Sequence, residues 1–267
     1  MFGISRQAIY QAELRISKRN KELLQVKIMV QSLRMDQPRL GTRKLYYLLK
    51  ERITESGIKI GRDALFNYLR LENMLIKPLK NYTKTTYSKH WLKKHPNLYG
   101  GVCLVTRPEE FFVSDITYVK SNQGTHYLSL VTDAYSRKIM GYKLSNNMEA
   151  ENVVKALNMA INNRTTNEKL IHHSDRGLQY ASGIYQKVLL DNSIEPSMTD
   201  GYDCYQNALA ERINGILKQE FLLYRCNNMR DLEKLVKESI NTYNSKRPHL
   251  SLNMKTPNFV HEKKPAN

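Results

Sequence analysis

The chain has 267 residues, enough for one large domain or two modest ones with a substantial core. A net charge of +17 and an isoelectric point near 9.7 favour a polyanionic partner such as nucleic acid. No apolar run approaches 18 residues, so we expect no membrane span, and three cysteines without a Cys-x-x-Cys pair argue against a zinc site. Lacking a signal peptide pattern, the chain is expected to be cytoplasmic.

The positive charge is concentrated at the front of the chain. Residues 1–100 hold 21 Lys and Arg against 7 Asp and Glu, whereas residues 101–267 hold 21 against 18. This asymmetry favours a nucleic-acid-binding front over the simpler alternative of a solvated basic surface.

Residues 1–35 are predicted to form an N-terminal helical segment, because leucines recur near helical spacing among charges from residue 11 onward. Ser5 is a plausible N-cap at its start. Two interpretations of this start stay open. It is either the tail of a helix-turn-helix begun on another polypeptide, with Arg6 and Gln7 near DNA, or a frayed basic end.

Residues 36–80 are predicted to form a helix-turn-helix-like DNA-binding domain. Its second helix, 60–70, follows a turn at Ser56-Gly57 and has an inner apolar face. A purely structural helix pair is the alternative. The side chains expected to face DNA are Arg43, Lys44, Arg62, Asn67 and Arg70.

Residues 81–107 are predicted to be a basic linker, whose lysines either follow a phosphate backbone or keep a tether soluble. Residues 108–267 are predicted to form the catalytic domain. The expected strands are 111–119, 126–132, 138–144, 169–173 and 194–197, and the expected helices are 150–162, 178–190, 207–224 and 232–244. Three antiparallel strands followed by alternating helices and strands indicate an α/β domain.

Three carboxylates stand out in this domain. Asp115 lies inside an apolar strand, where an Asp is costly unless it is paired, hydrogen-bonded or bound to metal. Asp175 ends a second apolar strand, and Glu211 follows after 35 intervening residues in the second turn of a helix. Such residues can converge on a pair of Mg²⁺ or Mn²⁺ ions, which prefer oxygen ligands. Two metals about 3.5–4 Å apart would clamp the attacking and leaving oxygens of a phosphodiester.

The helix that carries Glu211 has a polar stripe. At about 100° per residue, Asn207, Glu211, Asn214 and Lys218 fall on one side, within about 60°. A polar stripe is usually the solvated face of a surface helix, but this one holds the Glu that completes the set of three carboxylates.

These segments resemble the catalytic core of the DDE transposases and retroviral-type integrases, and more closely the OrfB proteins of insertion-sequence-3-type elements, over roughly residues 30–260. The motifs that carry the resemblance are Asp115-Ile116-Thr117-Tyr118, His173-Ser174-Asp175-Arg176-Gly177 with Gln179-Tyr180, Asn207 with Glu211, and Tyr243-Asn244 with Arg247 and His249.

The resemblance implies a ribonuclease-H-like integrase core preceded by a small all-α helix-turn-helix domain, and a transposase that cleaves and joins DNA at the ends of an insertion sequence. Asp115, Asp175 and Glu211 would be catalytic and hold two Mg²⁺ or Mn²⁺ ions per site. Lys218 and Asn207 would contact DNA. His173 would orient the metal ligands without binding the metal itself. The implied partners are double-stranded element ends and target DNA, further copies of the chain, and an upstream OrfA protein as partner or fusion, in the bacterial cytoplasm and nucleoid.

Two other functions stay open. One is a nuclease of the same fold that only hydrolyses, and the other is a catalytically inactive DNA-binding regulator. The basic front and the spacing from Asp175 to Glu211 weigh against the first, and the three intact carboxylates weigh against the second.

Overall fold

The computed structural model describes residues 5–77, 79, 92–98, 105–200 and 207–263. The chain divides into two compact units, Met1–Pro78 and Leu79–Asn267. No helix within the described ranges is both long enough and apolar enough to cross a membrane.

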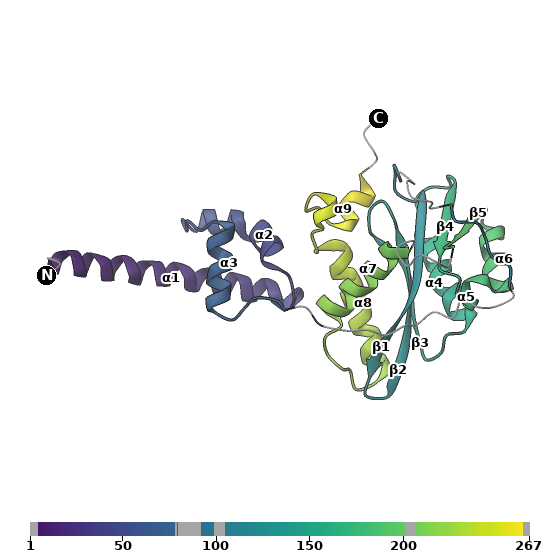
Figure 1. Ribbon diagram of the computed structural model, residues 1–267, viewed down its shortest axis with the longest axis horizontal. Helices are drawn as coiled ribbons and strands as arrows, with labels where there is room; N and C mark the ends of the chain where they lie inside the picture. The colour runs from purple at the N-terminus through teal and green to yellow at the C-terminus, as the bar shows by residue number, and fades with distance from the viewer. Residues whose placement is uncertain (1–4, 78, 80–91, 99–104, 201–206, 264–267) are drawn as a thin grey trace. The chain divides into compact units, whose positions relative to one another are not determined.

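Three helices build the first unit: α1 (Arg6–Asp36), α2 (Thr42–Glu55) and α3 (Arg62–Leu71) (Figure 1). The Ser5 hydroxyl accepts a hydrogen bond from the Ala8 amide and caps α1, as its position predicted. The helix pair predicted between residues 36 and 80 is present as α2 and α3.

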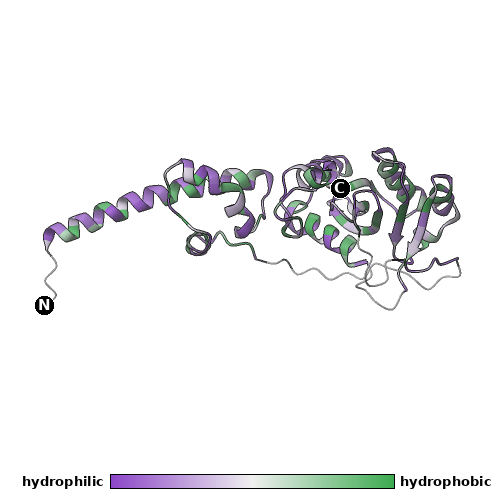
Figure 2. Cartoon of the chain, turned by 90° about the horizontal axis from the view of Figure 1, so that it is seen from above, coloured by the Kyte–Doolittle hydropathy of each residue, from purple (hydrophilic) through white to green (hydrophobic). Residues whose placement is uncertain are grey.

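One small core joins these helices. Val26 and Val30 of α1 pack with Leu45 and Leu49 of α2 and with Leu65 of α3, so the predicted segments 1–35 and 36–80 share a single unit. Before Val26, the described part of α1 has no buried residue and mixes hydrophilic and hydrophobic side chains (Figure 2).

The second unit is built on a five-stranded sheet of order β3-β2-β1-β4-β5. The strands are β1 (Phe111–Ser121), β2 (Gly124–Asp133), β3 (Ile139–Ser145), β4 (Leu170–Ser174) and β5 (Ile194–Met198). The first three form the antiparallel meander predicted from the sequence, and β4 and β5 extend it in parallel from β1. Strand β1 therefore pairs antiparallel with β2 on one side and parallel with β4 on the other.

Helices cover both faces of this sheet (Figure 1). The helices are α4 (Ala150–Asn162), α5 (Leu178–Ala181), α6 (Gly183–Asp191), α7 (Ala208–Ile216), α8 (Met229–Ser245) and α9 (Pro257–Glu262), with a π-helical turn η2 (Leu217–Phe221) and a 3-10 turn η3 (Leu250–Leu252). Helices α4 to α6 pack on one face around Phe112 and Val131, and α7 and α8 pack on the other around Leu128 and Leu130. Because side chains alternate along β1, Asp115 belongs to the α7 face.

Two predicted helices differ from the structure. The helix expected at 178–190 is split, because Ser182 is extended and its hydroxyl caps α6 by accepting from the Tyr185 amide at 3.4 Å. The helix expected at 207–224 changes to a π-helical turn at Leu217 and ends at Phe221.

Most of the predicted linker 81–107 lies outside the described residues. The described part reaches the sheet, because the Pro96 carbonyl accepts from the Met198 amide at 3.2 Å and the Leu98 amide donates to Ser197 Oγ at 2.9 Å. Pro96 and Leu98, which lie in the predicted linker, therefore run along the edge strand β5.

Candidate active site

The register of β1 and β4 brings Asp115 and Asp175 together. The last parallel pair of these strands is Ser114 with Ser174, and each carboxylate is the next residue along its strand. Neighbouring strands lie about 4.8 Å apart, so the two Asp residues leave adjacent strands side by side. Strand β4 stops there while β1 continues, which places the pair at the carboxyl end of the parallel segment.

Helix α7 lies across β1 and contributes the third carboxylate. Asn207 Nδ2 donates to the Ser114 carbonyl at 3.1 Å, and Asn214 Nδ2 donates to Asp115 Oδ2 at 2.7 Å. Glu211 lies between these residues on the same helix and is solvent-exposed. The polar stripe predicted on this helix therefore faces the carboxylate-bearing strand and, at Asn207 and Asn214, is buried instead of solvated.

The three carboxylates act on one another electrostatically. Burial, the Asp175 charge and, to a smaller degree, the Glu211 charge raise the pKa of Asp115 to about 7, against the hydrogen bonds from Asn214 and from the Ile116 amide. Burial and the Asp175 charge also raise the pKa of Glu211. Both shifts come first from burial and then from the neighbouring negative charges, and a bound cation would offset that repulsion.

Carboxylate oxygens are the ligand type that Mg²⁺ and Mn²⁺ prefer, so the donor set fits such a cation. Over the described ranges, however, no group of three or more His, Cys, Asp or Glu side chains is arranged to hold a metal ion. The three carboxylates are near one another without closing around a single point.

Lys218, Asn207 and His173 occupy different surroundings. Lys218 Nζ lies 3.1 Å from Thr117 Oγ1 beside the site, and burial lowers its pKa while the Asp115 charge opposes that shift. Asn207 is buried with its amide turned toward β1. His173 is fully buried, with Nδ1 2.8 Å from Ser197 Oγ on β5. Their predicted DNA-contact and orienting roles stay predictions.

The sequence did not single out the buried group behind Asp115. His172 Nε2 lies 2.7 Å from Ser114 Oγ and 2.9 Å from the Tyr185 hydroxyl. Burial, with a smaller effect of His173, lowers the pKa of His172 to about 3, so its imidazole is neutral, with both hydroxyls within hydrogen-bond distance of Nε2. The sequence motif includes His173, but nothing in it indicates the contacts that His172 makes.

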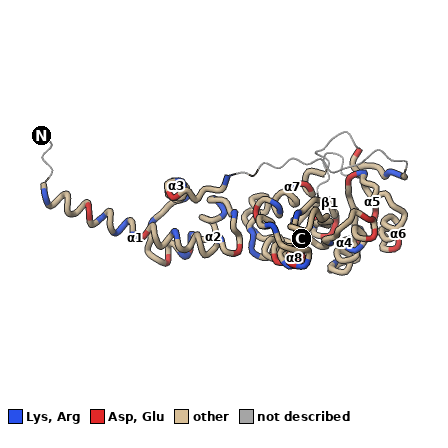
Figure 3. The backbone as a smooth tube through the Cα atoms, turned by 90° about the horizontal axis from the view of Figure 1, so that it is seen from below, with Lys and Arg blue, Asp and Glu red and all other residues tan. Residues whose placement is uncertain are grey.

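In the first unit, the predicted DNA-facing residues of α3 are exposed. Arg62 pairs with the exposed Asp63 at 2.9 Å, and the Arg70 guanidinium stacks over Phe66 at 4.8 Å. Asn67 is exposed on the same helix. On α2, Arg43 is exposed and Lys44 is half-buried. Figure 3 shows Lys and Arg recurring along α1 and α2.

Known protein families match the second unit of this chain. The integrase core domain family matches residues 105–204, and a second integrase core domain family matches residues 192–257. An uncharacterized 31 kDa protein of insertion element IS600 from Shigella sonnei is 34% identical over 268 residues, covering 98% of this chain and 97% of that protein. Transposase InsF for insertion sequence IS3A from Escherichia coli is 33% identical over 172 residues, covering 64% of this chain and 60% of that protein.

A cryo-EM structure of the simian T-cell lymphotropic virus intasome in complex with PP2A regulatory subunit B56 gamma contains a similar chain. It is 18% identical with a TM-score of 0.53, covering 85% of this chain and 76% of that one. This likeness shows the fold alone: a mixed α/β, ribonuclease-H-like integrase core. Together with the near full-length similarity to the IS600 protein, these matches establish that the chain belongs to the insertion-sequence-3-type transposases with an integrase core.

Proposed function

We propose that this chain cleaves and joins DNA at the ends of an insertion sequence, with Asp115, Asp175 and Glu211 as the carboxylates that hold its catalytic metal. Transposition is the function of the family. The observation that carries the residue assignment is geometric: the register of β1 and β4 brings Asp115 beside Asp175, which directly follows β4, and α7 with Glu211 is held to Asp115 by the Asn214 hydrogen bond. A charge arrangement that is unfavourable alone becomes favourable around a divalent cation.

Two Mg²⁺ or Mn²⁺ ions would supply Lewis-acid stabilisation of the phosphodiester and lower the pKa of the attacking hydroxyl. The chain's own residues hold this site in place. Asn214 fixes one oxygen of Asp115, and the Ile116 amide donates to the other at 2.9 Å. Lys218 extends along the same face of β1, where its ammonium would bind a DNA phosphate.

The reaction has two phosphoryl-transfer steps. Water attacks phosphorus at an element end and breaks its bond to a 3′ oxygen, which leaves as a 3′-hydroxyl. That hydroxyl then attacks a second phosphodiester, forming a new bond to phosphorus and releasing another 3′ oxygen. No side chain acts as a nucleophile in either step, so positioning and charge stabilisation suffice.

The first unit would bind element ends through α3, using Arg62, Asn67 and Arg70, with Arg43 and Lys44 of α2 on the phosphates. Joining two ends requires more than one copy of the chain on DNA. An upstream OrfA protein, as a partner or as a fusion before α1, would add further DNA-binding surface.

The test of this function is cleavage and joining of labelled DNA that carries the element's own ends, in Mg²⁺, with wild type and Glu211→Gln side by side. We expect joined products from the wild type only, with DNA binding equal in both proteins. Cleavage without joining would identify a nuclease. Activity that survives in Glu211→Gln would refute the residue assignment, and DNA binding with no chemistry in either protein would favour the regulator.

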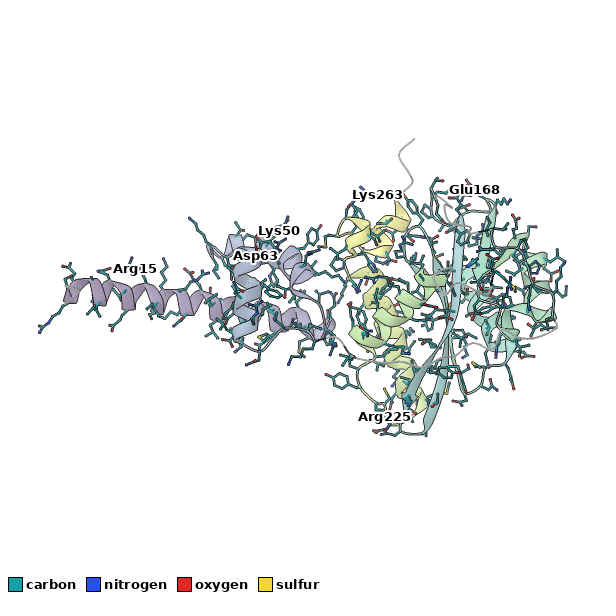
Figure 4. The ribbon with its side chains drawn as sticks, in the orientation of Figure 1. Arg15, Lys50, Asp63, Glu168, Arg225 and Lys263 are labelled. Carbon is teal, nitrogen blue, oxygen red and sulfur yellow. The ribbon has the colours of Figure 1, made fainter. Side chains whose placement is uncertain are left out.

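The DNA-binding assignment has a separate test in the salt dependence of binding. Arg70→Ala is expected to weaken binding to element ends and to reduce the slope of log K against log salt by about one. The matched control is Arg225→Ala, because Arg225 is an exposed arginine beside the β1–β2 hairpin of the other unit (Figure 4). Equal effects of the two substitutions would argue against a specific role of α3.

A further inference from the structure

The turn η2, which directly follows α7, has a π-helical conformation. The Leu222 amide donates to the Leu217 carbonyl at 2.9 Å, which closes the turn over five residues. Turns of this kind are rare and occur frequently at functional sites. Leu217 and Phe221 bury their side chains in the core of the α7–α8 face. Lys218 and Glu220 lie between these two residues, so a contact that fixes one of them constrains the other.

A buried arginine holds Glu220. Arg247 Nε donates to Glu220 Oε2 at 2.7 Å, and Arg247 Nη2 donates to Glu220 Oε1 at 2.6 Å, so the pair is bidentate. The Arg247 side chain is 4% exposed. Its Nη1 lies 3.0 Å from His249 Nε2, and its guanidinium lies over the Tyr243 ring at 5.8 Å. Because the guanidinium is planar and contacted on its edges and its face, it fixes the position of the Glu220 carboxylate.

Arg247 is in turn anchored to the sheet through the end of α8. Asn244 Oδ1 accepts from the Ile139 amide at 3.0 Å, and Asn244 Nδ2 donates to the Ile139 carbonyl at 3.0 Å. The Tyr243 hydroxyl donates to the Arg137 carbonyl at 3.0 Å. These bonds attach the last turn of α8 to the start of β3. The motif of Tyr243, Asn244 and Arg247 therefore connects the sheet to η2.

Lys218 is the residue of η2 that faces the candidate active site. Its Nζ lies 3.1 Å from Thr117 Oγ1, and Thr117 is two residues beyond Asp115 on β1. Residues two apart on a strand share a face and lie about 7 Å apart. A lysine side chain is flexible, so the place that its ammonium reaches depends on how firmly its backbone is held. The contacts that fix η2 therefore also decide where the Lys218 ammonium lies.

We propose that Arg247 is a positioning residue for DNA cleavage and joining: by binding Glu220 it holds η2, and η2 keeps the Lys218 ammonium beside Asp115. The inference rests on the proposed function, in which Lys218 binds a DNA phosphate. The alternative is an ion pair that only stabilises the fold. Arg247→Lys separates the two, because lysine keeps the charge but cannot bind both Glu220 oxygens in a fixed plane.

The test is a double-mutant cycle in the full chain, with Mg²⁺ and labelled DNA that carries the element's own ends. The joining rate at saturating DNA is measured for wild type, Arg247→Lys, Lys218→Ala and the double variant. We expect Lys218→Ala to slow joining about 100-fold and Arg247→Lys to slow it about tenfold. Because Arg247 acts through Lys218, the double variant should be no slower than Lys218→Ala. A loss of about 1,000-fold, the product of two independent effects, would overturn the proposal.

Arg164→Lys is the matched control. Arg164 is also a largely buried arginine, 10% exposed and 3.7 Å from the buried Glu109, but it follows α4 on the other face of the sheet. Any effect of Arg164→Lys on joining should multiply with that of Lys218→Ala. If Arg247→Lys fails to fold in urea titrations, Glu220→Gln replaces it, because this substitution breaks the same ion pair from the other side.

Hydrogen exchange of the Leu222 amide, followed by NMR, gives a second readout that does not depend on DNA chemistry. We expect exchange at Leu222 to be at least about tenfold faster in Arg247→Lys and unchanged in Arg164→Lys, since only the first substitution loosens η2. Unchanged exchange in Arg247→Lys would overturn the proposal. Absence of joining by the wild type would refute the proposed function, while Leu222 exchange would still decide whether Arg247 holds the turn.

Discussion

Two acidic clusters lie a few residues apart on the same sheet, and they are built in opposite ways. Glu109, just before β1, and Asp133, at the end of β2, are both fully buried. The Glu109 carboxylate accepts from the Thr165 amide at 2.8 Å and the Thr166 amide at 3.1 Å, and His261 Nε2 lies 3.2 Å from it.

Asp133 is supported in the same way. Its Oδ1 accepts from the Glu109 amide at 2.9 Å, its Oδ2 accepts from the Ser136 amide at 2.8 Å, and His261 Nδ1 lies 3.5 Å away. His261 thus bridges the two carboxylates and attaches α9 to the sheet. This cluster is complete without a ligand.

The Asp115 cluster is incomplete by comparison. Asp115 accepts from the Ile116 and Asn214 amides but faces Asp175 and Glu211, and its pKa is raised to about 7. The difference shows two kinds of buried carboxylate: Glu109 and Asp133 are surrounded by protein donors, whereas Asp115, which we propose to be catalytic, is left beside Asp175 and Glu211.

The largest expected effect comes from Asp115→Asn. Removing a ligand of the proposed metal site should reduce DNA joining by more than the roughly 10–100-fold that loss of an outer partner costs. The same substitution removes a like charge, so metal-free stability at pH 8 should stay equal or rise. Joining assays and urea unfolding measure the two effects. If Asp115→Asn still joined DNA, Asp115 would not be required for the reaction.

The complementary substitution is Glu109→Gln. The substitution removes the buried negative charge that Arg164 and His261 face. We therefore expect the free energy of unfolding to fall by about 3–5 kcal/mol. Mn²⁺ affinity of the folded protein should not change. A stability within 1 kcal/mol of the wild type would show that this cluster is not structural in the sense argued above.

A smaller effect is expected from Asn214→Ala. The substitution removes the amide that donates to Asp115 Oδ2 at 2.7 Å, so the carboxylate loses orientation while keeping its charge. Joining activity should fall about 10–100-fold. Ile216→Ala on the same helix, at a partly buried position, is the control, because it changes packing without touching the carboxylate. An equal loss of joining activity from both substitutions would show that Asn214 contributes only packing.

The smallest effect is in the pH dependence of the stabilisation by Mg²⁺. Because the folded state raises the pKa of Asp115 from 3.8 to about 7, it binds more protons than the unfolded state between those values. Metal-free stability from this group therefore falls as pH rises from about 4 to about 7. Mg²⁺ should raise the melting temperature more at pH 8 than at pH 6, where protonated Asp115 competes with the ion. Thermal unfolding checks this, and an Mg²⁺ effect that is independent of pH would contradict it.

Much of this architecture could be predicted from local patterns. Short apolar runs predicted all five strands, and the polar stripe marked the side of α7 that carries Glu211. The break between α5 and α6 was missed, although Ser182-Gly183 is a recognisable start of a helix. The π-helical turn at Leu217 has no such local signal.

The parts that could not be predicted depend on residues far apart in sequence. The bond from Asn214 to Asp115 spans 99 positions, and that from His261 to Glu109 spans 152. A sequence shows that Glu109, Asp115 and Asp133 are carboxylates near strands, but only the fold shows which of them has enough donors. Arg247 was visible as part of a motif, whereas its pairing with Glu220 was not.

The most direct test of the shared carboxylate site is a crystal structure of the protein soaked with Mn²⁺, with data collected at the manganese absorption edge. The account predicts anomalous density between Asp115 and Asp175, with Glu211 turned toward it, and none at Glu109 or Asp133. Density absent from Asp115 and Asp175, or located at the Glu109 cluster, would contradict the claim that β1, β4 and α7 build one metal site.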